Sequence, residues 1–124
     1  MSVITESDIH KSDQGRLQPC AVVLTTTNDD EVRQLLIEQL LEKQLAACVQ
    51  VLPISSYYQW HGEINQDQES LLIIKMVKTQ YKAVEHLILS VNTYQVPQVV
   101  MLPIETGYAE YLQWINKHAQ PDVL

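Results

Sequence analysis

One pattern occurs twice along the chain, and it constrains the fold more than any other feature. Residues 22–54 contain an apolar strand-like stretch, a helical stretch and a second apolar stretch that closes on Val51-Leu52-Pro53-Ile54. Residues 74–104 repeat this order and close on Met101-Leu102-Pro103-Ile104. Each half therefore predicts strand, helix, strand. Two such units in tandem form the ferredoxin-like βαββαβ plait, an α+β fold.

Length and charge limit the classes of protein that fit this chain. The 124 residues suit one domain, which we assign to residues 19–124, after a polar and mobile N-terminal tail over residues 1–18. A net charge of −7, with eight dispersed Lys and Arg, disfavours nucleic acid as a partner. No apolar run approaches the ~18 residues of a membrane span. The tail lacks the features of a signal peptide, so we expect a cytoplasmic protein.

Three helices are predicted from capping residues and apolar spacing. Asn28 suits the N-cap of the first helix, with Glu31 three residues later as in a capping box. The second helix follows Thr79. A short third helix is expected from Tyr108 to Lys117.

A long β-hairpin is predicted between the first two helices. Residues 48–79 contain two long strand-like stretches around a polar turn region at 60–68. Pro53 indicates a bulge or an edge position in the first stretch. Both strands exceed the usual five or six residues, so they should extend beyond the helices that cover the sheet.

The second stretch of this hairpin contains a run of apolar residues without alternation, Leu71 to Ile74. A strand with one solvated face should alternate, so the run indicates that both faces are covered. The helices of a plait cover only one face. A second copy of the chain is the simplest cover for the other, which predicts an oligomer.

The two cysteines are not expected to form a disulfide. Cys20 and Cys48 should begin the first and second strands, which the third strand separates in a plait. Two strand spacings of about 4.8 Å exceed the ~7 Å reach of a disulfide. We interpret both as small buried apolar residues.

Lys75 is the most unusual charge because it lies in an otherwise apolar strand. Two readings remain open: an ion pair, with Glu69 or Glu105 as partner, or a ligand-binding cleft at a subunit junction. The aromatic residues Tyr58, Trp60 and Tyr94 fit either interface packing or a binding platform. No phosphate loop or nucleophile elbow is present, so the sequence does not predict an enzyme.

Several blocks of residues resemble a known family in order and spacing. They are Ala46-Ala47-Cys48-Val49, Tyr58-x-Trp60-x-Gly62, Glu69 to Lys75, Tyr94-x-x-Pro97, Leu102-Pro103-Ile104, Gly107 and Tyr111-Leu112-x-Trp114. This set is similar to the CutA divalent-cation-tolerance proteins. The resemblance implies a ferredoxin-like subunit, a cytoplasmic homotrimer with long hairpins exchanged between neighbours, and a role in tolerance of divalent metals, with copper binding in some members.

The metal ligands of that family do not carry over. Some members have a Cys where this chain has Thr25, a His pair where it has Val91 and Asn92, and a Glu where it has Gln98. Copper prefers sulfur and imidazole ligands. We therefore expect no tight copper site of that type, and any Cu²⁺ or other divalent cation should bind weakly.

Two functional hypotheses follow. The first is a homotrimeric, non-enzymatic protein of the divalent-cation-tolerance type. The alternative is a regulatory trimer, similar to the PII signalling proteins, that binds a small ligand in a cleft between subunits. The candidate cleft residues are Lys75, Tyr94, Trp60, Gln98 and Glu69.

Overall fold

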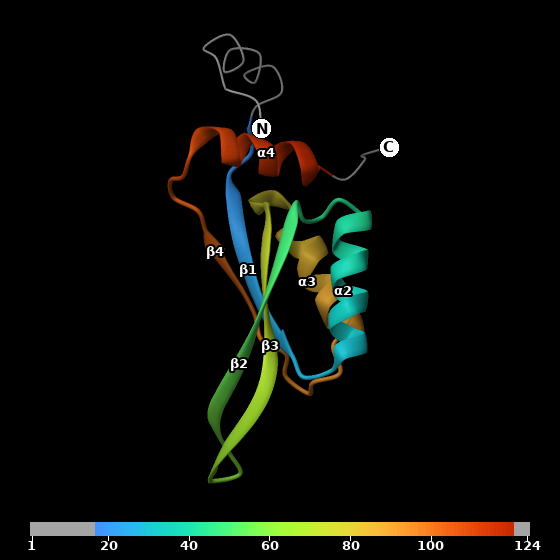
Figure 1. Cartoon of the computed structure of the whole chain (residues 1–124), viewed down its shortest axis with the longest axis vertical. Helices are drawn as coiled ribbons and strands as arrows, with labels where there is room; N and C mark the ends of the chain where they lie inside the picture. The colour runs from blue at the N-terminus through green and yellow to red at the C-terminus, as the bar shows by residue number, and fades with distance from the viewer. Residues whose placement is uncertain (1–16, 121–124) are drawn as a thin grey trace.

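The computed structural model describes residues 17–120, which form one four-stranded antiparallel sheet with its helices (Figure 1). In chain order the elements are β1 (Cys20–Thr27), α2 (Asp30–Glu42), β2 (Cys48–Trp60), β3 (Glu63–Val77), the 3-10 helix η1 (Lys78–Gln80), α3 (Tyr81–Val91), β4 (Val99–Pro103) and α4 (Ala109–His118). The strand order is β2-β3-β1-β4. This order confirms the predicted βαββαβ arrangement. The third helix begins and ends one residue later than predicted.

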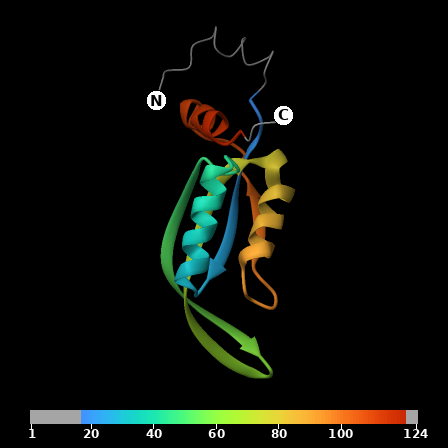
Figure 2. The same ribbon diagram turned by 90° about the vertical axis from the view of Figure 1, so that its right-hand side faces the viewer.

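The main core lies between the sheet and the two long helices, which cover the same face (Figure 2). Alternate residues of β1 and β3 point toward this core, and their side chains are fully buried: Val23, Leu72, Ile74 and Met76. They meet the apolar stripes of the helices, Val32, Leu36, Leu40, Val84, Leu87 and Ile88. Helix α4 packs across one end of the opposite face, over a smaller cluster of Cys20, Val77, Ile115 and Ala119.

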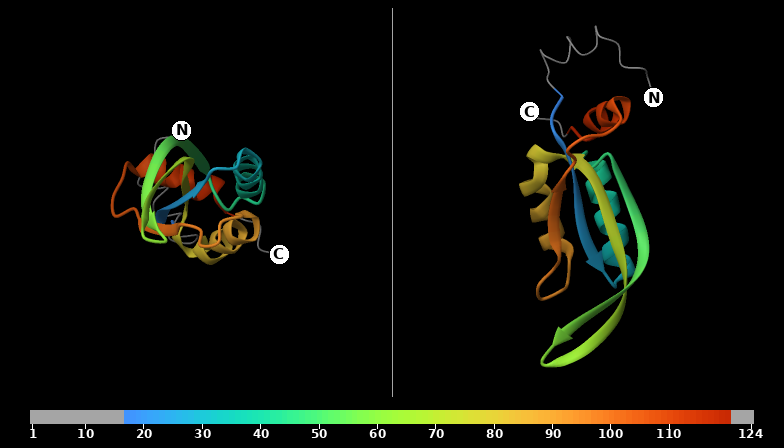
Figure 3. Two further views of the ribbon diagram at one scale, coloured as in Figure 1. Left: turned by 90° about the horizontal axis from the view of Figure 1, so that it is seen from below. Right: turned by 90° about the vertical axis from the view of Figure 1, so that its left-hand side faces the viewer.

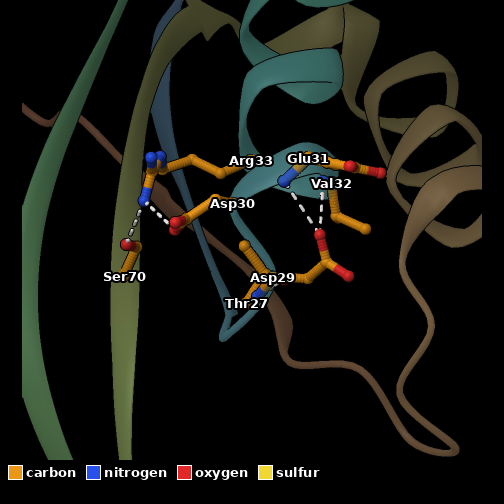
Figure 4. A network of polar contacts seen from close by, with 7 residues as sticks. All are labelled: Thr27, Asp29, Asp30, Glu31, Val32, Arg33 and Ser70. Atoms are coloured by element: carbon orange, nitrogen blue, oxygen red, sulfur yellow. Dashed lines mark hydrogen bonds and ion pairs between the residues drawn. The ribbon is translucent and has the colours of Figure 1, made fainter.

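Helix α2 begins one residue later than predicted. The N-cap is Asp29, whose Oδ1 accepts hydrogen bonds from the backbone N–H groups of Glu31 at 2.8 Å and Val32 at 3.0 Å (Figure 4). The prediction of Asn28 is therefore wrong. The hydroxyl of Thr27 accepts the N–H of Asp29 at 3.1 Å, so the end of β1 fixes the residue that starts the helix.

Strands β2 and β3 continue well beyond the sheet. Pairing of β1 with β3 ends at Thr27 and Ser70, so residues 54–69 pair only with each other. We call this segment the arm, and Figure 3 shows it projecting away from the helices. His61 and Gly62 have φ values of 53° and 78° and make a two-residue turn. The predicted polar turn over 60–68 is wrong, because β3 already begins at Glu63.

The positions of Pro53 and the cysteines follow from the strand order. Strand β2 lies at the edge of the sheet, and Pro53 pairs with Ser70 in an unbroken register, so the edge interpretation is correct and the bulge is not. Strand β3 separates Cys20 from Cys48, and both thiols are free, as predicted. Cys20 is buried as expected, whereas Cys48 is only half-buried, because it lies on the edge strand.

The predicted tail over residues 1–18 lies outside the described residues, except for Leu17 and Gln18. The backbone N–H of Gln18 donates to Asn116 Oδ1 at 2.7 Å, and Asn116 Nδ2 donates back to its carbonyl at 3.1 Å. The described chain therefore starts attached to α4.

Candidate functional site

The face of the sheet opposite α2 and α3 is apolar, and residues 17–120 cover only its end. Leu71 and Ile73 lie on this face and are half-buried, while their neighbours Leu72 and Ile74 are fully buried. Further apolar side chains on the same face are about half exposed: Leu52 at 50%, Val100 at 45% and Leu102 at 52%. The non-alternating run therefore has one face in the core of this chain and one face without a cover.

Lys75 lies on this face where α4 crosses it. Its Nζ donates to the phenol oxygen of Tyr111 at 3.1 Å and lies 5.3 Å from the centroid of that ring. Among residues 17–120, no carboxylate lies within ion-pair distance of it, so the expected pairing with Glu69 or Glu105 does not form within this chain. Tyr111 is 36 residues away in sequence, and no local pattern links the two.

A second polar group lies at the base of the arm on the same face. Glu69 accepts hydrogen bonds from Tyr94 Oη at 2.6 Å and Ser56 Oγ at 2.5 Å, and Tyr58 donates to Asp67. Burial raises the pKa of Tyr94, and the bond to Glu69 raises it further. The bond to Asp67 raises the pKa of the exposed Tyr58. These tyrosines therefore act as neutral donors to the two carboxylates.

One copy of the chain brings together only part of the predicted cleft. Tyr94 and Glu69 are in contact. Lys75 is six residues farther along β3, which is roughly 20 Å at about 3.3 Å per residue. Trp60 lies beside the turn of the arm, and Gln98 is exposed just before β4. The five candidates do not form a single site within one chain.

The loop between α3 and β4 is held by Asn92. Its Nδ2 donates to the carbonyl of Thr26 at 3.0 Å, and its Oδ1 accepts the backbone N–H of Tyr94 at 2.8 Å. The side chain thus attaches the loop to β1 and presents Tyr94 toward Glu69. The sequence did not predict this role of Asn92, which was singled out only because it stands where the resemblance implies a metal-binding His.

The residues at the positions where the resemblance implies metal ligands are poor donors for copper. Thr25 is fully buried, and its Oγ1 has no hydrogen-bond partner among residues 17–120. Val91 packs against the core, and both polar ends of Asn92 are already bonded. Neutral oxygens and an amide are poor copper ligands. No group of three His, Cys, Asp or Glu that could hold a metal ion occurs among residues 17–120.

These observations define a class: a small α+β protein with a βαββαβ sheet, one uncovered apolar sheet face and a projecting hairpin. None of the helices in residues 17–120 is long and apolar enough to cross a membrane. Comparison with known proteins then gives the family. The model for the CutA1 divalent ion tolerance proteins matches residues 21–118. The chain belongs to this family.

Three relatives illustrate the similarity. The divalent-cation tolerance protein CutA of Thermus thermophilus is 38% identical over 98 residues, which cover 78% of this chain and 95% of that protein. "Protein CutA, chloroplastic" of Arabidopsis thaliana is 34% identical over 111 residues, covering 89% of this chain and 61% of that protein. The solved structure of the periplasmic divalent cation tolerance protein CutA of Archaeoglobus fulgidus matches this chain with a TM-score of 0.77 and a sequence identity of 31%. The match covers 82% of this chain and 99% of that protein's chain. None of these names states a catalytic activity.

Proposed function

We propose that this chain is a cytoplasmic, non-enzymatic protein of the divalent-cation-tolerance type that acts as a homotrimer. The observation that carries the proposal is the uncovered apolar face beside the projecting arm. Ile73 and Leu71 are half-buried within one copy, and the arm exposes Tyr57 at 68% and Ile64 at 78%. Exposed apolar surface of this extent marks an interaction site.

The geometry favours a ring of copies. The sheet face and the arm are different surfaces, so an arm of one copy on the face of the next makes a head-to-tail contact. Contacts of this kind form closed rings when the rotation closes. The family resemblance supplies three as the number of copies. Self-association accounts for these surfaces without nucleic acid or membrane as a partner.

Sedimentation tests the assembly directly. At micromolar concentration the untagged protein should give one species near three times the chain mass of 14.2 kDa. Obligate interfaces usually bury more than ~2,000 Å², so the species should persist on dilution. A stable monomer at this concentration would contradict the proposed homotrimer.

Any copper binding should be weak, because the donor set described above does not suit that metal. Calorimetry with Cu²⁺ on a variant lacking residues 1–18 should give no site tighter than about micromolar. The combined change Thr25→Cys, Val91→His and Asn92→His should raise the affinity, since it supplies sulfur and imidazole. Asn92→His alone is the matched control, because it breaks the loop contact without completing a ligand set. A tight, stoichiometric site in the wild type would contradict the proposal.

The cytoplasmic location is a proposal of its own. It rests on the family resemblance described above, while the names of two relatives state a chloroplast and a periplasm. Fractionation of cells that express the full chain should recover it with cytoplasmic markers. Recovery in another compartment would overturn this part alone.

A second candidate function is a regulatory trimer, similar to the PII proteins, with a small ligand between subunits. The observation that favours it is Lys75, a half-buried cation without a carboxylate partner in residues 17–120. A ligand screen by thermal shift separates the two candidates. A turnover assay on each stabilising compound tests whether the protein is an enzyme.

A further inference from the structure

Residues 17–120 contain two pairs in which a lysine lies over a tyrosine ring, and they differ in one respect. On α3, Lys82 Nζ lies 5.9 Å from the centroid of Tyr81. Glu85 completes this pair: Tyr81 Oη donates to its Oε2 at 2.6 Å, and Lys82 Nζ lies 3.6 Å from its Oε1. The bond from Tyr81 lowers the pKa of Glu85, so the carboxylate is anionic at neutral pH. This triad shows how a carboxylate joins an ammonium and a phenol.

The second pair, Lys75 and Tyr111, is closer but lacks the carboxylate. Nζ is 5.3 Å from the ring centroid and 3.1 Å from the phenol oxygen. Because that oxygen accepts a hydrogen bond from the ammonium, its own O–H remains a donor, and the ammonium keeps two further N–H groups. The pair therefore offers three unused hydrogens, one phenol O–H and two ammonium N–H, which suit an oxyanion.

The surroundings strengthen the preference for an anion. Lys75 is the only Lys or Arg in the four strands, and its near neighbour on the same face is the apolar Ile73. The side chain is half-buried in a single copy, and any copy that covers the sheet face would bury it further. A buried charge is costly unless it is paired. The same burial makes a correctly placed anion bind more strongly than it would in water.

We propose that Lys75 and Tyr111 form an oxyanion-binding pair at the junction between copies, which receives the carboxylate or phosphate group of a small ligand. The proposal deepens the second candidate function and rests on the proposed assembly. It names the chemical class of the ligand and assigns Tyr111 as a hydrogen-bond donor beside the lysine. Stacking of Tyr111 on Trp114, with ring centroids 5.8 Å apart and planes 13° apart, holds the phenol in place.

Anion binding by the full, untagged chain tests the proposal, with acetate and inorganic phosphate as probes and chloride at equal ionic strength as the reference. Saturation-transfer NMR follows acetate, and the line width of the phosphorus signal follows phosphate. Binding of either probe in the wild type is expected. Lys75→Met should weaken it by about tenfold or more, because charge-assisted hydrogen bonds are lost. Tyr111→Phe should weaken it less, since the ammonium remains.

Lys82→Met is the matched control, because it removes a lysine that lies over a tyrosine but already has Glu85 as partner. It should leave anion binding unchanged. No probe binding beyond that of chloride, or equal binding by Lys75→Met, would overturn the proposal. A loss of trimer stability in Lys75→Met without any anion response would also overturn it, because an acidic side chain of a neighbouring copy would then fill the pair. Sedimentation in the same buffers shows separately whether the assembly exists, so the two failures are distinguishable.

Discussion

Strands β2 and β3 run through both the body of the sheet and the arm, but their side chains pack differently in the two regions. In the body, every second residue of β3 from Leu72 to Met76 is fully buried against helices. In the arm, Ile64 is 78% exposed and Tyr57 is 68% exposed, although the pairing of β2 with β3 continues without a break. The arm is instead tied across its strands by polar side chains, such as Gln68 Nε2 to Ser55 Oγ at 2.8 Å.

The difference shows that backbone pairing alone does not account for the stability of the arm. Isolated two-stranded hairpins are at best marginally stable in water. A long arm with exposed apolar residues therefore indicates that another surface completes its packing, whereas the body has a core of its own. The body should be sensitive to local changes at any protein concentration. The arm and the uncovered face should be sensitive through assembly.

The largest effect is expected on the uncovered face. Ile73→Asp should dissociate the proposed trimer, because a carboxylate without a partner in a face that the assembly covers costs several kcal/mol. Light scattering measures the mass. The control is Leu89→Asp, which places the same charge on an exposed position of α3 and should leave the trimer intact. If Ile73→Asp remains trimeric, this face is not an interface.

A smaller effect is expected at the turn of the arm. Gly62 has a φ of 78°, and a Cβ there would meet nothing within 4 Å, so Gly62→Ala adds backbone strain alone, about 1–2 kcal/mol. Urea unfolding of the trimer should show this loss if the arm unfolds together with the assembly. His61→Ala is the control, since an L-residue already occupies its positive φ. An unchanged midpoint for Gly62→Ala would show that the arm is not coupled to global unfolding.

In the body, a smaller effect is expected from removing the N-cap of α2. Asp29→Ala should lower the free energy of unfolding by about 1 kcal/mol, because two N–H groups at the start of α2 lose their acceptor. Asn28→Ala should change it little. Because this effect is local, it should be the same at different protein concentrations. Equal losses for the two variants would contradict the assignment of the N-cap to Asp29.

The smallest effect concerns pH at the base of the arm. The pKa of Tyr94 is raised from its ordinary value of 10.0, so the folded state favours the protonated phenol that donates to Glu69. This contribution is complete below about pH 10 and is lost as the pH rises toward the raised pKa. As the pH rises from about 9 to about 11, the free energy of unfolding should therefore fall more for the wild type than for Tyr94→Phe. Urea unfolding at each pH measures this free energy. Parallel profiles would contradict the role of this bond.

Much of the fold could be predicted because its signals are local or repeated. The tandem strand-helix-strand pattern predicted the element order. The run from Leu71 to Ile74 predicted a strand with two covered faces, and the structure places one of them, with Leu72 and Ile74, in the core. The start of α2 was missed by one residue, since Asn28 and Asp29 are both good N-caps and only the contact with Thr27 decides between them. The polar residues 65–68 suggested a turn because the arm has no helix on either face.

The candidate site was harder to predict because its contacts are long-range. Glu69 and Tyr94 were both named from the sequence, but their direct bond joins residues 25 apart. Tyr111 was missed as the partner of Lys75, and Asn92 was missed as the residue that ties its loop to Thr26, 66 residues earlier. Pairings of this kind depend on how whole helices and strands pack together. The spacing of residues along the sequence does not predict that packing.

The strand order has a consequence for synthesis of the chain. Strand β1 emerges first, yet its two neighbours are β3 and β4, so it cannot pair with the strand that follows it. Its partner for Thr27 is Ser70, and its partner for Thr25 on the other side is Val99. At ~5–20 residues per second, β1 waits several seconds for its second neighbour. Of the two inner strands of the finished sheet, β1 is thus the one that lacks its full set of partners for longest as the chain grows.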